Sequence, residues 1–213
     1  MHGDKADLKT IELGKLIYWL RQYLDIHRMI GLNADLLKKK EAGGTYWGVN
    51  YRMALDAIAV TVCKIFERET MGYERNSIPG IIAELEGKKL AGARAACVRR
   101  YGEKYKIRTS GTQPAATFCA VVSAFKDAHS KSFQRLKDYR NKIGSHSEHG
   151  FRGEDLPSHD EFETIFEFAN HFYRTAHELD DVHGALMTKH AEMGLVPVFK
   201  KLGIENPTRN FPD

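Results

Sequence analysis

The chain of 213 residues is 42% hydrophobic and 28% charged, which is enough for one well-buried core and excludes an intrinsically disordered protein. Its longest uninterrupted apolar runs are only a few residues, and residues 1–9 mix charges of both signs, so we expect neither a membrane span nor a secretory signal peptide. The formal net charge of +4 is modest and by itself indicates no class of partner.

Apolar residues spaced three and four apart dominate the chain, which predicts helices rather than strands. A first helix begins within residues 4–7 and bends before Asn33, which caps a short continuation. A second helix spans about residues 46–68. A third begins at Ser77, because Pro79 in a first turn is typical of a helix start.

Residues 90–105 predict a short basic helix, and a long helix follows with Thr112 as its N-cap and Pro114 in its first turn. This long helix carries a seam of alternating steps of four and three: Phe118, Val122, Phe125, His129, Ser132, Leu136, Tyr139 and Ile143. Such a seam packs against a neighbouring helix. Gly144 and the serine after it end the helix.

Ser158 and Glu161 have the spacing of a capping box, which predicts the start of the last core helix. Three prolines occur after residue 194, so we expect residues 194–213 to form an extended C-terminal tail. The predicted fold class is an all-α, up-down helical bundle over residues 1–193, with a basic helical insertion at about residues 87–113.

Charge is distributed unevenly along the chain. Against Glu103 alone, residues 87–113 carry eight basic side chains: Lys88, Lys89, Arg94, Arg99, Arg100, Lys104, Lys106 and Arg108. Residues 154–181 carry nine acidic residues against Arg174. All of the basic residues except Lys106 are therefore candidate contacts for a nucleic acid, and the alternative is a solvated insertion that keeps the protein soluble.

The three cysteines, Cys63, Cys97 and Cys119, lack the spacing of metal ligands and lie near small apolar residues. We expect them to be buried free thiols in a reducing cytoplasm. His146 and His149 lie three apart with no third ligand nearby, and no phosphate-cradling glycine loop is present. We therefore expect neither a metal site nor a cofactor.

Arg140, Asn141 and His146 lie close together in the sequence where the long helix stops. RNA cleavage by internal transesterification needs a base for the 2′-OH proton, an acid for the leaving 5′-oxygen, and cations for the developing charge. Histidine titrates in the useful range, and the arginine fork matches two phosphate oxygens. Asn141 can orient the imidazole or donate to the phosphate. By spacing alone, the alternative is that Arg140 pairs with Asp138 or Glu148 and that His146 is a polar loop residue.

Three further residues are candidates for supporting this site. Arg52 and Asp56 lie four positions apart on the second helix, which is the spacing of an ordinary intrahelical ion pair. Tyr139 belongs to the seam and immediately precedes Arg140. We keep both interpretations of Arg52 and Asp56, as a simple pair and as support for the site.

The stretch from Leu136 to His146 resembles the signature of the HEPN superfamily (higher eukaryotes and prokaryotes nucleotide-binding). In that signature an arginine and a polar residue, often asparagine, precede a histidine by a short fixed gap. Residues 50–57, followed by the helix start at residues 77–79, resemble the abortive-infection AbiU-like branch. The resemblance covers about residues 8–186 in helix order, and only residues 140–146 are specific.

This resemblance implies a helical bundle, usually a homodimer, and in many members a metal-independent endoribonuclease acting on RNA in toxin–antitoxin or phage-defence systems. It implies Arg140, Asn141 and His146 as the functional residues, with the motifs of two protomers meeting at the dimer interface. One arginine and one histidine can hardly supply base, acid and charge stabilisation, whereas two copies supply two of each. The partner would be an antitoxin or another defence protein.

The resemblance leaves two points open. Some family members only bind a nucleotide, a nucleic acid or a partner protein, so a non-catalytic module is the alternative to a nuclease. A purely structural helical protein, whose dimer interface buries the seam, is a third interpretation. The basic segment of residues 90–108 lies outside the minimal family core, so the resemblance implies no role for it.

Overall fold

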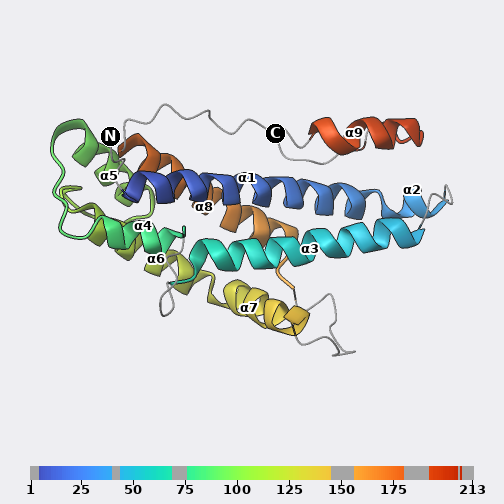
Figure 1. The fold of residues 1–213 in the computed structure, drawn as a ribbon, viewed down its shortest axis with the longest axis horizontal. Coiled ribbons are helices and arrows are strands. Elements are labelled where there is room, and N and C mark those ends of the chain that lie inside the picture. The colour runs from blue at the N-terminus through green and yellow to red at the C-terminus, as the bar shows by residue number, and fades with distance from the viewer. Residues whose placement is uncertain are drawn as a thin grey trace.

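A computed structural model describes residues 5–39, 44–68, 76–144, 156–179, 192–205 and 207, and these form an all-α bundle without strands, which confirms the predicted fold class (Figure 1). The helices in this part of the chain are α1 Lys5–Leu32, α2 Ala34–Lys39, α3 Gly44–Phe66, α4 Ile78–Glu84, α5 Gly92–Lys104, α6 Pro114–Ala128, α7 Ser130–Gly144, α8 His159–Leu179 and α9 Glu192–Lys201. Among the residues described, no helix combines the length and the apolar character that crossing a bilayer requires.

The main core lies between α1, α3 and α8. Helix α1 packs along α3 on one side and along α8 on the other (Figure 1). It contributes a fully buried stripe spaced three and four apart: Leu13, Ile17, Leu20 and Leu24. Because burying each such side chain stabilises the fold by about 1.5–3 kcal/mol, this stripe determines which face of α1 turns inward.

Two of the predicted helix starts are confirmed. The Ser77 side chain accepts a hydrogen bond from the backbone N–H of Gly80 at 3.2 Å, which caps α4. At the start of α8, the Glu161 backbone N–H donates to Ser158 Oγ at 3.2 Å, and the Ser158 N–H donates to the Glu161 carboxylate at 2.7 Å. This reciprocal capping box satisfies two N–H groups that the helix itself leaves without partners.

The predicted long helix after Pro114 is instead two helices, α6 and α7, which meet at His129. The break has a packing reason, because α6 contacts α4 and α5 whereas α7 contacts α3. One straight helix could not follow both surfaces. The described seam residues still turn inward on both sides of the break, with Phe118 and Leu136 fully buried.

The predicted N-cap of α6 is wrong by one residue. Gln113, rather than Thr112, is the N-cap, and its side chain makes no capping hydrogen bond. The Thr112 hydroxyl instead lies 2.8 Å from Ser110 Oγ in the preceding loop. A short hydroxyl side chain can form hydrogen bonds within a loop as easily as at a helix end. Here the Thr112 hydroxyl bonds within the loop, so it does not cap α6.

The extended tail predicted for residues 194–213 is wrong for its first part, because residues 192–201 form α9 with Pro197 inside the helix. The last residues, 208–213, lie outside the described part of the chain. Phe199 of α9 is fully buried and its ring centroid lies 5.2 Å from that of Trp47. This apolar packing outweighs the backbone hydrogen bond that a proline removes from a helix.

The basic segment is anchored firmly to the end of the bundle. Ala95, Val98 and Tyr101 are buried, and the Tyr101 ring packs against Phe118 of α6 with a centroid distance of 5.2 Å. Gly111 follows at a left-handed φ of +75°, where a Cβ would clash with the backbone oxygen of Ala95. The loop after α5 can therefore close onto this helix only with glycine at position 111.

Replacing Gly111 by alanine should destabilise the protein by at least about 2 kcal/mol, because the backbone strain of a positive φ is added to a clash with backbone atoms. Gly87 provides the matched control, since it has a φ of +74° and no atom lies within 4 Å of the position that a Cβ would take. Its alanine variant should lose only about 1 kcal/mol, the conformational part alone. Urea unfolding of both variants measures the difference, and equal losses would contradict the close approach.

Candidate functional site

Arg140 and Asn141 lie side by side on the last turn of α7. The half-buried Arg140 donates through Nη2 to Asn141 Oδ1 at 3.2 Å and through Nη1 to Glu67 Oε1. Asn141 is exposed. His146, the third predicted residue, lies outside the described residues. The structure therefore brings the arginine and the amide of the motif together and gives the arginine a carboxylate partner.

This carboxylate partner is not one that the sequence indicated. The alternative interpretation paired Arg140 with Asp138 or Glu148, but the observed acid is Glu67, directly after the end of α3. Asp138 accepts from Gln134 Nε2 at 2.7 Å, and Glu148 lies outside the described residues. Because guanidinium has five N–H donors, the contacts to Glu67 and Asn141 leave donors for a phosphate.

Arg52, Asp56 and Tyr139, the three supporting candidates, contact one another and join α3 to α7. Arg52 Nε lies 3.1 Å from Asp56 Oδ1, and the buried Tyr139 hydroxyl donates to the same oxygen at 2.5 Å. The Arg52 guanidinium carbon lies 5.0 Å from the centroid of the Tyr139 ring. Burial and then the Asp56 carboxylate raise the pKa of Tyr139, so this hydroxyl stays a proton donor. The group fixes the turn of α7 that carries Arg140.

Basic side chains gather around this end of α7 in a way the sequence did not reveal. We call Arg68, Lys126, Lys137 and Arg140 the basic cluster. The pKa of the Lys126 ammonium is lowered, and the largest cause is burial. The positive charges of Arg68 and Lys137 lower it further, whereas the carboxylate of Asp127 acts in the opposite direction. Lys137 and Arg140 both act on the buried thiol of Cys63, opposing the rise in pKa that burial causes. Lys126 therefore lies close enough to Arg68 and Lys137 to be repelled by them, and Arg140 lies with Lys137 near Cys63.

The predicted nucleic-acid contacts on the basic segment lie elsewhere. Lys88 is half-buried, and the other six are exposed: Lys89, Arg94, Arg99, Arg100, Lys104 and Arg108. Figure 1 shows α5 at one end of the bundle, where it packs on α6 and α8, while α7 projects from the middle and packs on α3. The structure thus separates the α5 side chains from Arg140.

The expectation of three buried thiols is correct for Cys63 only. Cys119 is exposed, and Cys97 is half-buried with its thiol donating to Glu178 Oε2 at 3.0 Å. Burial and then Glu178 raise the pKa of Cys97 to about 11. Among the cysteines, which all lie in the described residues, Cys119 is thus the exposed thiol.

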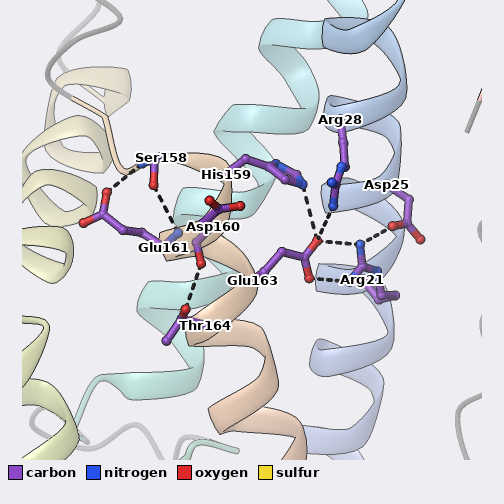
Figure 2. A network of polar contacts seen from close by, with 9 residues as sticks. All are labelled: Arg21, Asp25, Arg28, Ser158, His159, Asp160, Glu161, Glu163 and Thr164. Atoms are coloured by element: carbon purple, nitrogen blue, oxygen red, sulfur yellow. Dashed lines mark hydrogen bonds and ion pairs between the residues drawn. The ribbon is translucent and has the colours of Figure 1, made fainter. Parts of the chain in front are cut away.

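A second polar network joins α1 to α8, and its hub is Glu163 (Figure 2). Arg21 donates to both Glu163 oxygens at 2.7 and 2.9 Å, and His159 Nε2 lies 3.3 Å from Oε1. Arg28 lies 3.8 Å from the same carboxylate, while Arg21 also pairs with Asp25. Burial alone would raise the pKa of Glu163, but the contacts from His159 and Arg21 outweigh it and lower this pKa to about 2. The network aligns two core helices.

Two histidines in the structure are held neutral. His27 stacks on the Tyr51 ring with centroids 4.1 Å apart, and burial, then His159, lowers its pKa to about 4. His171 Nδ1 lies 3.1 Å from the Tyr105 hydroxyl, and burial followed by neighbouring cations also lowers its pKa to about 4. Both depart from the ordinary histidine value of 6.5.

Stability should therefore fall as the pH drops from 6.5 toward 4, because in this window the unfolded chain binds protons on His27 and His171 that the folded chain does not. Thermal unfolding at intervals between pH 6.5 and 4.5 measures the effect before Glu163 titrates. His171→Asn should show a shallower decline in Tm than the native chain. An unchanged decline would show that His171 titrates normally in the folded state.

Comparison of the chain with protein-family models, with curated proteins and with solved structures found no match. A function can therefore be inferred only from the residues of this chain and their arrangement. Among the described residues, the place where chemistry-bearing side chains from distant segments converge next to a predicted motif is the end of α7, with Arg140 as its centre.

Proposed function

We propose that the chain is a metal-independent endoribonuclease of a toxin–antitoxin or phage-defence system, acting as a HEPN-type homodimer. The observation that supports this most is the arrangement of Arg140, anchored by Glu67 and adjacent to Asn141, on the helical turn that leads to His146 in the sequence. A guanidinium held in place and an imidazole that can reach the same phosphate are the groups that RNA transesterification needs.

In the proposed reaction the 2′-oxygen of a ribose attacks the adjacent phosphorus while the bond from phosphorus to the 5′-oxygen breaks. The imidazole of His146 from one protomer takes the 2′-OH proton, and the protonated imidazole of the partner donates a proton to the leaving 5′-oxygen. Arg140 neutralises the charge that develops on the phosphorane. The products are a 2′,3′-cyclic phosphate and a 5′-hydroxyl.

A specific observation also favours the second candidate, a non-catalytic module that binds a nucleotide, nucleic acid or partner protein. Arg140 already has a carboxylate partner in Glu67, and the two side chains are 27% and 32% exposed. A phosphate must compete with this carboxylate for the guanidinium. In a binding module the ion pair would simply hold α3 against α7, and no cleavage would follow.

Incubation of total RNA in EDTA with the native chain and with His146→Ala, prepared side by side, tests the proposal. We expect cleavage by the native chain, a bell-shaped dependence of its rate on pH, and no cleavage by the variant. Equal cleavage by both preparations would contradict the assignment of His146. RNA binding without cleavage, unchanged in the variant, would favour the binding module.

A further inference from the structure

Helices α4 and α6 border a groove that none of the roles described so far uses. It consists of two adjoining cavities of about 410 and 560 Å³, which share Ile82, Glu86 and Cys119. Pro79 and Val122 line the larger cavity, and small alanine side chains of α6 line the other. The groove thus offers a continuous surface, and its middle combines Ile82 and Cys119 with the carboxylate of Glu86.

Basic side chains stand at both ends of this groove. Arg68 and Lys126 line the larger cavity, and Lys88 and Lys89 line the smaller one. Two acidic side chains, Glu86 and Asp127, also line it, so the basic residues outnumber the acidic ones. An anionic chain with regularly spaced charges complements this pattern better than a neutral or a cationic ligand does.

At the larger cavity, Asp127 is the described acid whose charge acts on Lys126, and it offsets the effects of burial, Arg68 and Lys137 only in part. No ion pair joins Arg68, Lys126 or Lys137 to a described acid, although Asp127 follows Lys126 in the sequence. Lys126 is half-buried, and its pKa is lowered by burial and then by Arg68. Holding like charges this close is unfavourable, and a bound anion would relieve it.

The same end of the groove adjoins Arg140. Arg68 directly follows Glu67, the partner of Arg140, and Lys137 precedes Arg140 by one turn of α7. The basic cluster therefore extends from the groove toward the candidate site. By contrast, α5 packs on α6 and α8 at the end of the bundle (Figure 1).

We propose that a single strand of RNA binds in the groove between α4 and α6, with its phosphates at Arg68 and Lys126, and that the basic cluster leads it to Arg140. This inference rests on the proposed function and names its substrate path. Riboses and bases supply the faces that the apolar side chains lining the groove, such as Ile82 and Val122, can contact.

The role of contacting RNA thus passes from the exposed side chains of α5 to residues that the fold assembles, while Lys88 and Lys89 of the basic segment still line the smaller cavity. The eight basic residues between positions 87 and 113 are conspicuous in the sequence. Arg68, Lys126 and Lys137 come from three separate segments and stand out only once α3, α6 and α7 are in place.

Equilibrium binding of a fluorescent 2′-O-methyl RNA 12-mer in EDTA tests this path without cleavage, because the methyl group blocks the 2′-oxygen. Replacing Arg68 and Lys126 together by alanine should weaken binding about tenfold at low salt and reduce the slope of log K against log salt by about 1.4, which is twice the value for one phosphate on a single strand. The matched control replaces Arg99 and Lys104 of α5 and should change the affinity less than twofold.

Cys119 allows a second measurement that does not depend on the double variant folding. Because this exposed thiol lies where the two cavities join, a bulky maleimide on it should block the groove. Modification should weaken RNA binding in the native chain and leave binding by Cys119→Ser unchanged.

Three results would overturn the proposal. They are equal weakening by both double variants, RNA binding that survives the maleimide, and binding of poly-glutamate in preference to the RNA probe. The test of the groove and the test of the nuclease can fail independently. Groove-dependent binding without cleavage of unmodified RNA would refute the nuclease alone, and cleavage with groove-independent binding would refute the groove alone.

Discussion

Replacing Arg140 by alanine should lower the rate of RNA cleavage by at least about a hundredfold, since removing one preformed donor to the charge of a transition state typically costs 10²–10³ in rate. The chain should remain folded. The ion pair between Arg140 and Glu67 is partly exposed, and such pairs contribute about 1 kcal/mol or less to stability. Single-turnover cleavage and thermal unfolding of the same preparation separate the two effects.

Arg135 gives the matched control for this experiment. It lies on the same helix, is 43% exposed, and stands 3.8 Å from Glu161 rather than at the end of α7. Arg135→Ala should cleave RNA at the native rate. Arg140→Lys should retain binding but recover little cleavage, because lysine keeps the charge and loses the planar fork. Native cleavage by Arg140→Ala would remove this residue from the site.

Replacing Glu163 by alanine should destabilise the chain by about 3 kcal/mol, because it leaves the guanidinium of Arg21 and the neighbouring Arg28 without their shared carboxylate. In a protein of this size such a loss corresponds to a fall in Tm of roughly 6–12 °C. Their side chains are 14–20% exposed, so water replaces the missing contacts only in part. Differential scanning calorimetry at pH 7 measures the change.

Two further variants show whether charge or shape carries this effect. Glu163→Gln keeps the size of the side chain and removes its charge, and it should be nearly as destabilising as alanine if the ion pairs dominate. Glu167, one turn later on α8 and exposed, is the control, and its alanine variant should change stability by less than about 0.5 kcal/mol. A Glu163→Ala chain as stable as this control would contradict the network's structural role.

The sequence predicted correctly those features of the fold that neighbouring residues of a single segment determine. The capping box at Ser158 and Glu161 and the cap at Ser77 are read from neighbouring residues, and both are observed. The break at His129 was missed because the seam continues through it, and only the different partners of α6 and α7 bend the chain there. Helix α9 was not predicted because Pro197 indicates a break, whereas Phe199 packs in an apolar cluster with residues distant in the sequence.

In the candidate site, too, the residues that are close in the sequence were predicted and those that are distant were not. Arg140 and Asn141 were found because they are adjacent in the sequence, and Arg52 with Asp56 because they are one helical turn apart. The partner Glu67 lies 73 positions from Arg140, so no spacing rule reaches it. The same holds for Arg68 and Lys126, whose proximity depends on how α3 and α6 pack. In the sequence, the run of basic residues around α5 is the stronger charge signal.

The end groups of the RNA products test the central claim most directly. An RNA oligonucleotide cleaved by the native chain in EDTA should carry a 2′,3′-cyclic phosphate on one fragment and a 5′-hydroxyl on the other, as mass spectrometry distinguishes. A single 2′-deoxynucleotide at the cleaved linkage should abolish cleavage there, because it removes the attacking oxygen. Fragments with a 3′-hydroxyl and a 5′-phosphate, or cleavage that tolerates the 2′-deoxynucleotide, would contradict transesterification at the Arg140 site.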